Sequence, residues 1–321
     1  MSLATLPPAR QAASGAGRGA GRGGDALGRS RFREWTEREA VFSWLMIGPP
    51  VLFLCAMVGY PFLYGVYLSL QSRPVAHAGE FIGLANFIAD WNDPVFWRVA
   101  RNTIVYTFVA TALKAVGGLG LALVMNQSFP MKNIVRATLL LPFIVPTVLS
   151  TIAWMWILDP TFSVLSWFLI YFGMAPPGPS WLGNSVLAMT SLILINTWRG
   201  LPFYAITLLA GLQTISPELH EAATIDGANS WHRFRYITLP LLQPVLFIVT
   251  MFSIIFTFSD FQLVYVLTRG GPANATHLFA TYAFDIAMSG GQFGLGASVA
   301  LSMLPLLALI IAALAIYMRK R

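Results

Sequence analysis

Residues 297–318, ASVALSMLPLLALIIAALAIYM, contain no charged side chain and are followed by the basic cluster Arg319-Lys320-Arg321. An α-helix needs about 20 residues to cross the roughly 30 Å hydrocarbon core of a bilayer, so this stretch predicts a membrane span. Other apolar stretches in the chain are as long. Together the predicted spans are 41–70, 102–125, 137–158, 185–212, 241–267 and 297–318. We therefore expect an all-α fold, a polytopic transmembrane helical bundle with six spans.

The overall composition points the same way. The chain is 56% hydrophobic and 10% charged, whereas soluble domains average about 25% charged residues. A net charge of +7 could indicate nucleic-acid binding, but Lys and Arg stand in short clusters beside apolar runs, which is typical of membrane topology. We expect no nucleic-acid partner. Cys55 is the only cysteine, which excludes an intramolecular disulfide and favours an inert buried thiol.

Basic residues distinguish the two sides of the membrane. The residues on one side are Arg10, Arg18, Arg22, Arg29, Arg31, Arg33, Arg38, Lys132, Arg136, Arg233, Arg235, Arg319, Lys320 and Arg321. The opposite loops hold only Arg73, Arg98, Arg101 and Arg269. Cytoplasmic loops carry the excess of Lys and Arg, so both termini are expected in the cytoplasm, in agreement with an even number of spans.

Two segments are not expected to span the membrane. Residues 1–38 are rich in Gly, Ala, Ser and Arg and predict a flexible Arg/Gly-rich cytoplasmic tail, which leaves 39–321 as the transmembrane domain. The apolar stretch 162–172 is too short to cross the bilayer and has Pro176, Pro177 and Pro179 behind it. It predicts an interfacial helix between the third and fourth spans.

The loop at 213–240 contains SPELHEAATIDGANSWHRFRYITLP, from Ser216 to Pro240. Ser216 is a suitable helix N-cap with Pro217 as the first helical residue, Gly227 interrupts the helix and Pro240 is expected to end the next one. The pattern predicts two short helices joined by a turn. Local physics alone favours an ordinary cytoplasmic loop, since capped loop helices are common.

The spacing within this loop resembles the EAA signature of permeases of binding-protein-dependent ABC importers. The matching positions, together with Asp226 in the same loop, are Glu221, Ala222, Ala223, Gly227, Ile237, Leu239 and Pro240. The resemblance implies that this segment is the coupling helix, which docks in a cleft of the ATPase subunit. Glu221 would carry the charged contact, Ala222 and Ala223 would permit close approach, and Gly227 would make the turn.

Other segments resemble the carbohydrate-uptake branch of these permeases, which includes maltose, multiple-sugar and glycerol-phosphate systems. They are FIGLANF at 81–87, LLLPFIVPTVLSTIAWMWILDP at 139–160, WRGLPFYAITLLAGLQTI at 198–215 and YVLTRGGPANATHLFATYAF at 265–284. The resemblance implies the type I ABC importer permease fold in a bacterial inner membrane. It also implies a second permease subunit, two ATPase subunits and an extracytoplasmic solute-binding protein as partners.

Charged residues within the predicted spans mark candidate solute contacts, because charge in a bilayer is costly. Arg199 shares a helix face with Asn196 and Phe203, and Asp260 with Ser253 and Phe256. A sugar site needs hydrogen-bonding groups beside aromatic faces, and these two stripes supply both. An interhelical ion pair or solvated outer-leaflet charges is the more common explanation for residues such as Arg199 and Asp260. For Lys114, a structural role and a functional one stay open.

The sequence has no G-x-x-x-x-G-K-[ST] loop, so the chain is not expected to hydrolyse ATP. We expect no catalytic residue, no metal site and no cofactor in this chain, with ATP and Mg bound by the partner ATPase subunits. A secondary transporter or channel subunit for a small polar solute is the alternative. That class tends to show internally repeated halves and mid-membrane carboxylates, and here Asp260 is the only candidate.

Overall fold

The computed structural model describes residues 39–75, 77, 79–174 and 178–319, so the predicted 1–38 tail lies outside the described residues. The chain divides into two compact units with the boundary between Phe62 and Leu63. The first helices are α2 (Glu39–Leu54), the π-helix η1 (Cys55–Gly59) and α3 (Tyr60–Ser69), which form one candidate span, Val41–Ser69. Cys55 is exposed, so the prediction of a buried thiol is wrong.

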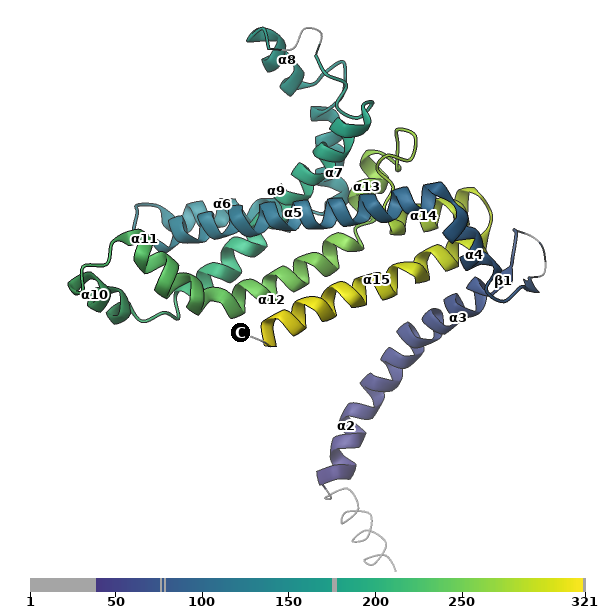
Figure 1. The fold of residues 1–321 in the computed structure, drawn as a ribbon, viewed down its shortest axis with the longest axis horizontal. Coiled ribbons are helices and arrows are strands. Elements are labelled where there is room, and N and C mark those ends of the chain that lie inside the picture. The colour runs from purple at the N-terminus through teal and green to yellow at the C-terminus, as the bar shows by residue number, and fades with distance from the viewer. Residues whose placement is uncertain (1–38, 76, 78, 175–177, 320–321) are drawn as a thin grey trace, which may run out of the picture. The chain divides into compact units, whose positions relative to one another are not determined.

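The second unit is built on four long helices that lie side by side (Figure 1). These are α5 (Pro94–Asn126), α9 (Ser185–Leu212), α12 (Leu239–Phe258) and α15 (Phe293–Arg319). Shorter elements precede or connect them: β1 (Gln71–Ser72), β2 (Glu80–Phe81), α4 (Ala85–Asn92), α6 (Lys132–Ile144), α7 (Thr147–Ile157), α8 (Val164–Tyr171), α10 (Pro217–Ile225), α11 (Ser230–Arg233), η2 (Phe234–Thr238), α13 (Gln262–Leu267), α14 (Phe279–Phe284) and η3 (Asp285–Ser289). Strands β1 and β2 pair antiparallel.

Helix α5 contributes to each of the three apolar clusters of this unit. Tyr106 packs with residues of α9 and α13, Phe96 with residues of α12, α14 and α15, and Ala122 with residues of α9 and α12. Its close contact with α9 depends on Gly118, because a Cβ there would collide with the Tyr204 side chain. Small residues at helix crossings let two backbones approach in this way.

Five of the described helices are long and apolar enough to cross a membrane, and a sixth span results if one bent pair is counted. The fourth predicted span, 185–212, agrees with α9, whose N-cap Asn184 accepts from the amides of Val186 and Leu187. The second begins earlier than predicted, because Asp93 caps α5 and Pro94 occupies its first turn.

The third predicted span is not a straight helix. Helices α6 and α7 meet at an angle of 92°, so one continuous helix over 137–158 is wrong. The cause is Pro146, since the residue before a proline is driven out of the helical region, and Val145 has an extended ψ of 130°. Residues 164–171 do form the short helix α8, and its interfacial position stays a prediction.

The fifth predicted span differs at both ends. The helix ends at Phe258 rather than 267, and a break at 259–261 separates it from α13. Pro240 does not end the preceding helix, because α11 continues through η2 into α12 and yields the candidate span Ser230–Phe258. The π-turn widens the backbone just before Pro240, where an ordinary helix would lose a hydrogen bond and meet the ring.

Candidate functional site

One cavity of about 610 Å³ is lined mainly by residues of α9, of the end of α12 and of the break that follows it. The six residues predicted to contact solute all line it: Asn196, Arg199, Phe203, Ser253, Phe256 and Asp260. The predicted alignment of Asp260 with Ser253 on one continuous helix is wrong, because Asp260 lies in the break after α12. The bend of the chain nevertheless keeps its side chain on the same cavity wall.

Arg199 and Asp260 do not form an ion pair with each other, so that interpretation of their charges is wrong. Arg199 donates from Nη2 to the Thr147 hydroxyl at 2.5 Å, across the gap to α7. The Arg199 Nε is buried and without a hydrogen-bond partner in the described part of the chain. A buried donor without a partner is costly, which makes this guanidinium available to an acceptor that enters the cavity.

Asp260 is held by residues of α5 and α9. Its Oδ2 accepts from the Tyr106 hydroxyl and from the Asn196 amide, both at 2.8 Å. Asn196 in turn accepts at Oδ1 from Lys114 Nζ at 2.7 Å, and Lys114 also donates to Thr257 at 2.8 Å. Lys114 is therefore part of the cavity wall together with residues that are far apart in the sequence.

Aromatic rings complete the lining. Phe143 and Phe203 stack with their centroids 5.8 Å apart and 17° between ring planes. Phe256 is 66% exposed in this chain and Phe261 also borders the cavity. Other lining residues, which the sequence pattern did not predict, are Phe143, Thr147, Phe261 and Gln262. No local pattern marks these residues, because the bend at Pro146 and the break after α12 bring them to the cavity.

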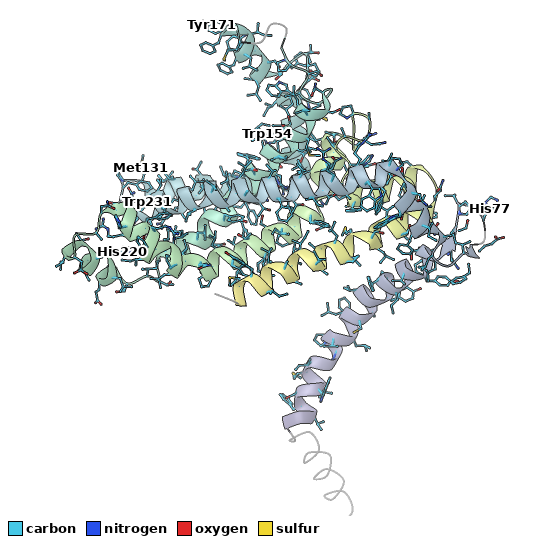
Figure 2. The ribbon with its side chains drawn as sticks, viewed as in Figure 1. His77, Met131, Trp154, Tyr171, His220 and Trp231 are labelled. Carbon is cyan, nitrogen blue, oxygen red and sulfur yellow. The ribbon has the colours of Figure 1, made fainter. Side chains whose placement is uncertain are left out.

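The coupling motif lies at one end of the unit, where Figure 2 shows His220 and Trp231, and His77 lies at the opposite end. Glu221, Ala222 and Ala223 are on α10, Asp226 and Gly227 follow it, and Ile237, Leu239 and Pro240 lie where the chain re-enters the bundle. Ser216 stands at the N-cap as predicted, but its side chain makes no capping hydrogen bond.

The spacing from Ala223 to Gly227 has a structural cause. The amide of Ala228 donates to the carbonyl of Ala223 and that of Gly227 to Thr224, which is the Schellman pattern of a helix end. Gly227 has φ +81°, a left-handed conformation that glycine adopts without strain. The predicted turn at Gly227 is therefore confirmed, with its unusual backbone angle.

Beyond the turn, α11 is fastened back onto α10. Arg233 donates to the Thr224 hydroxyl, and Asn229 caps α11 by accepting from the amide of His232 at 2.9 Å. A second cavity of about 920 Å³ separates this loop from the ends of α5 and α9, and Glu221 and Trp231 are among its lining residues. The loop is thus a projecting unit with its own hydrogen bonds.

Residues 114–321 match the family model of the binding-protein-dependent transport system inner membrane component. The trehalose/maltose transport system permease protein MalF of Thermococcus litoralis is 34% identical over 266 residues, 82% of this chain and 89% of the relative. The chain belongs to this permease family. The sulfoquinovosyl glycerol transport system permease protein SmoG of Agrobacterium fabrum is 32% identical and covers 90% of this permease and 93% of its own length.

The fold of the permease is also found in a solved importer. A bacterial alginate ABC transporter, in complex with an alginate pentasaccharide-bound periplasmic protein, has a chain that superposes with a TM-score of 0.75 at 19% identity, covering 90% of this permease and 96% of that chain. The fold is that of type I ABC importer permeases. Membership of this family decides against a secondary transporter or channel and identifies the permease as a membrane subunit of an ABC importer.

Proposed function

We propose that this permease forms, together with a second permease subunit, the translocation path for a sugar or a related solute delivered by an extracytoplasmic binding protein. The observation that carries the proposal is the 610 Å³ cavity, where Arg199 and the stacked pair Phe143 and Phe203 border the same space. Sugars present hydroxyl groups at their edges and C–H groups on their faces. Donors beside exposed aromatic faces suit both.

The relatives support a carbohydrate as the solute. The names of two relatives refer to trehalose or maltose and to sulfoquinovosyl glycerol, and the solved importer is described with an alginate pentasaccharide on its periplasmic protein. These solutes share a glycosidic framework and differ in size and charge. We therefore assign the class of solute and not an individual sugar.

The energy for transport would come from partners. In our proposal two ATPase subunits bind ATP and Mg, the permease holds no cofactor of its own, and α10 docks in a cleft of one ATPase subunit. Support comes from Ile225, which is 87% exposed at the tip of α10, and from Leu219, which is 47% exposed on the same helix. A partner subunit that docks on this loop would remove these two apolar side chains from water, which favours association.

The orientation that fits this arrangement has both termini and α10 in the cytoplasm of a bacterial cell, with the permease in its inner membrane. The basic residues of the loops support this orientation, since Arg233 on α11 and Arg235 on η2 lie on the same side as α10. The apolar faces of α12 and α15 would contact the lipid bilayer or the second permease, because much of their apolar surface is exposed in this chain.

The test is uptake by the complete importer, purified with its partners and reconstituted in liposomes. Arg199→Ala and Phe203→Ala should each raise the KM for the transported sugar by about five- to tenfold, since a buried hydrogen bond or stacking contact to solute contributes about 1 to 1.4 kcal/mol. The control is Phe168→Ala, an exposed aromatic on α8 outside the cavity. Unchanged uptake in both cavity variants, or no sugar accepted from a broad panel, would refute the proposal.

A further inference from the structure

A buried chain of hydrogen bonds joins two oppositely charged residues that line the cavity, Lys114 and Asp260. Lys114 on α5 and Asp260 after α12 are not in direct contact, and the amide of Asn196 on α9 bridges them. Lys114 is 4% exposed and Asn196 is 7% exposed. A single side-chain amide thus links α5, α9 and the break after α12.

The orientation of that amide follows from chemistry. An ammonium group can only donate, so Lys114 must face Oδ1 of Asn196, and an ionised carboxylate can only accept, so Asp260 must face Nδ2. Donation to Oδ1 also polarises the amide and strengthens its N–H as a donor to Asp260. The positive charge of Lys114 and the negative charge of Asp260 compensate each other through this amide. This matters because an uncompensated charge within a membrane span is costly.

Tyr106 is the last member of this chain of hydrogen bonds. Its side chain is fully buried, and its hydroxyl donates to the same Oδ2 of Asp260 that accepts from Asn196. The other carboxylate oxygen accepts from the amide of Leu263 at 3.4 Å, in the first turn of α13. Asp260 thereby fixes the break at 259–261. This break presents Ser259, Phe261 and Gln262 to the cavity.

Access for the lysine is provided by Gly200, one turn after Asn196 on α9. A Cβ at Gly200 would collide with Cδ of Lys114, so the missing side chain leaves the path along which the lysine stem reaches Asn196. Gly200 and Asn196 lie on one face of α9, so the gap left by Gly200 and the amide that Lys114 reaches are adjacent. The position of Lys114 is therefore enforced both by packing and by hydrogen bonds.

We propose that Lys114 and Tyr106 are positioning residues for solute selection. The hydrogen bonds from Lys114 to Asn196, from Asn196 to Asp260 and from Tyr106 to Asp260 hold the Asn196 amide and the 259–261 break in the one arrangement that shapes the cavity. Neither residue needs to touch the solute. The proposal rests on the proposed function in so far as the cavity is the solute path. The charge compensation between Lys114 and Asp260 can be measured without any solute.

The experiment uses the complete purified importer with four variants: Lys114→Met, Asp260→Asn, the double variant carrying both, and Lys132→Met as a matched control. Lys132 is an exposed lysine at the start of α6. Each single cavity variant should lower the midpoint of thermal unfolding, and the double variant should recover most of the loss because neutrality is restored. Uptake should show the same pattern. The double variant should transport about tenfold faster than expected from multiplying the fractional activities of the two single variants.

Purely additive losses, or a Lys114→Met complex that behaves like Lys132→Met, would overturn the proposal. If Lys114→Met prevents assembly, Tyr106→Phe removes only the hydroxyl, and it should raise the KM several-fold in an assembled complex. An unchanged KM in Tyr106→Phe overturns the positioning role. If the wild-type importer accepts no sugar, the proposed function fails, while the unfolding midpoints still decide on the charge compensation.

Discussion

The hydroxyl of Tyr282 on α14 donates a 2.6 Å hydrogen bond to the carboxylate of Asp93, the residue that caps α5. The other oxygen of Asp93 accepts from the amide of Val95 at 2.8 Å. Nearby, the Ser298 hydroxyl of α15 donates to Asp90 of α4 at 2.6 Å. Two carboxylates thus fasten four helices together at the end of the bundle opposite α10 (Figure 1).

Tyr282→Phe should lower the stability of the complex, because the Asp93 carboxylate would lose a charge-assisted hydrogen bond that contributes about 2 kcal/mol. Burial and the neighbouring Asp93 raise the pKa of Tyr282, so its hydroxyl remains a donor at physiological pH. The measurement is the midpoint of thermal unfolding. Tyr171→Phe, at an exposed position on α8, is the control, and equal midpoints for the two variants would contradict the assigned contact.

Asp90 predicts a pH dependence of stability. Burial raises the pKa of Asp90 from 3.8 to about 6, the Ser298 hydrogen bond lowers it in part, and the charge of Asp93 raises it. The folded state therefore holds a proton between pH 4 and 6 that the unfolded chain has released. Stability should rise as the pH falls through this window, by at most about 3 kcal/mol from this group.

Asp90→Asn should remove this contribution, so the difference in unfolding midpoint between variant and wild type should shrink from pH 7 to pH 4.5. The variant should be the more stable of the two at pH 7, where the wild type carries a buried charge. A difference that does not change with pH would mean that Asp90 has an ordinary pKa in the folded protein.

Gly118→Ala tests the contact between α5 and α9. The added methyl group would meet Tyr204, which is fully buried and has no room to move, and overpacking of this kind costs about 1 to 3 kcal/mol. Gly120→Ala, on the same helix with nothing within 4 Å of the added group, should leave stability unchanged or raise it slightly. A loss of stability that is the same for both variants would show that helix propensity, and not the close contact, explains the effect.

Substitutions at the tip of α10 should uncouple ATP hydrolysis from transport. At Gly227, Asn should be tolerated best, Ala less well and Pro least, because φ +81° strains a side chain and proline also removes the amide that donates to Thr224. The measurement is ATPase stimulation by the loaded binding protein in an assembled complex. Equal stimulation across the three variants would exclude a role for the turn.

Glu221→Lys reverses the charge that is predicted to meet the ATPase subunit. If the contact is partly desolvated, the loss of stimulation corresponds to about 2 kcal/mol, whereas a solvated contact would contribute much less. Glu218→Lys, one turn earlier on α10, is the matched control. Both variants behaving alike would place the docking contact elsewhere on the loop.

Reporter fusions test the orientation. A fusion after Asn229 should behave as cytoplasmic and one after Ile286 as exported, because the basic residues accumulate on the side of α10. The opposite result at either point would reverse the assignment of the termini.

The sequence by itself determined the helical membrane architecture and the turn at Gly227. Both depend on interactions between near neighbours. A long apolar run such as 297–318 becomes a helix in a bilayer, because a helix satisfies all of its backbone hydrogen bonds within the segment. Gly227 ends its helix through hydrogen bonds between residues that are no more than five positions apart in the sequence.

Only the tertiary structure decided how the intramembrane charges are used. Lys114 meets Asn196 across 82 positions, Asn196 meets Asp260 across 64, and Tyr106 meets Asp260 across 154. Helical periodicity placed Asn196 and Arg199 on one face, but it could not show that Arg199 turns to Thr147 rather than to Asp260. Partners so distant in the chain are chosen by the packing of α5, α9 and α12 and by the breaks at Pro146 and 259–261, which no local pattern specifies.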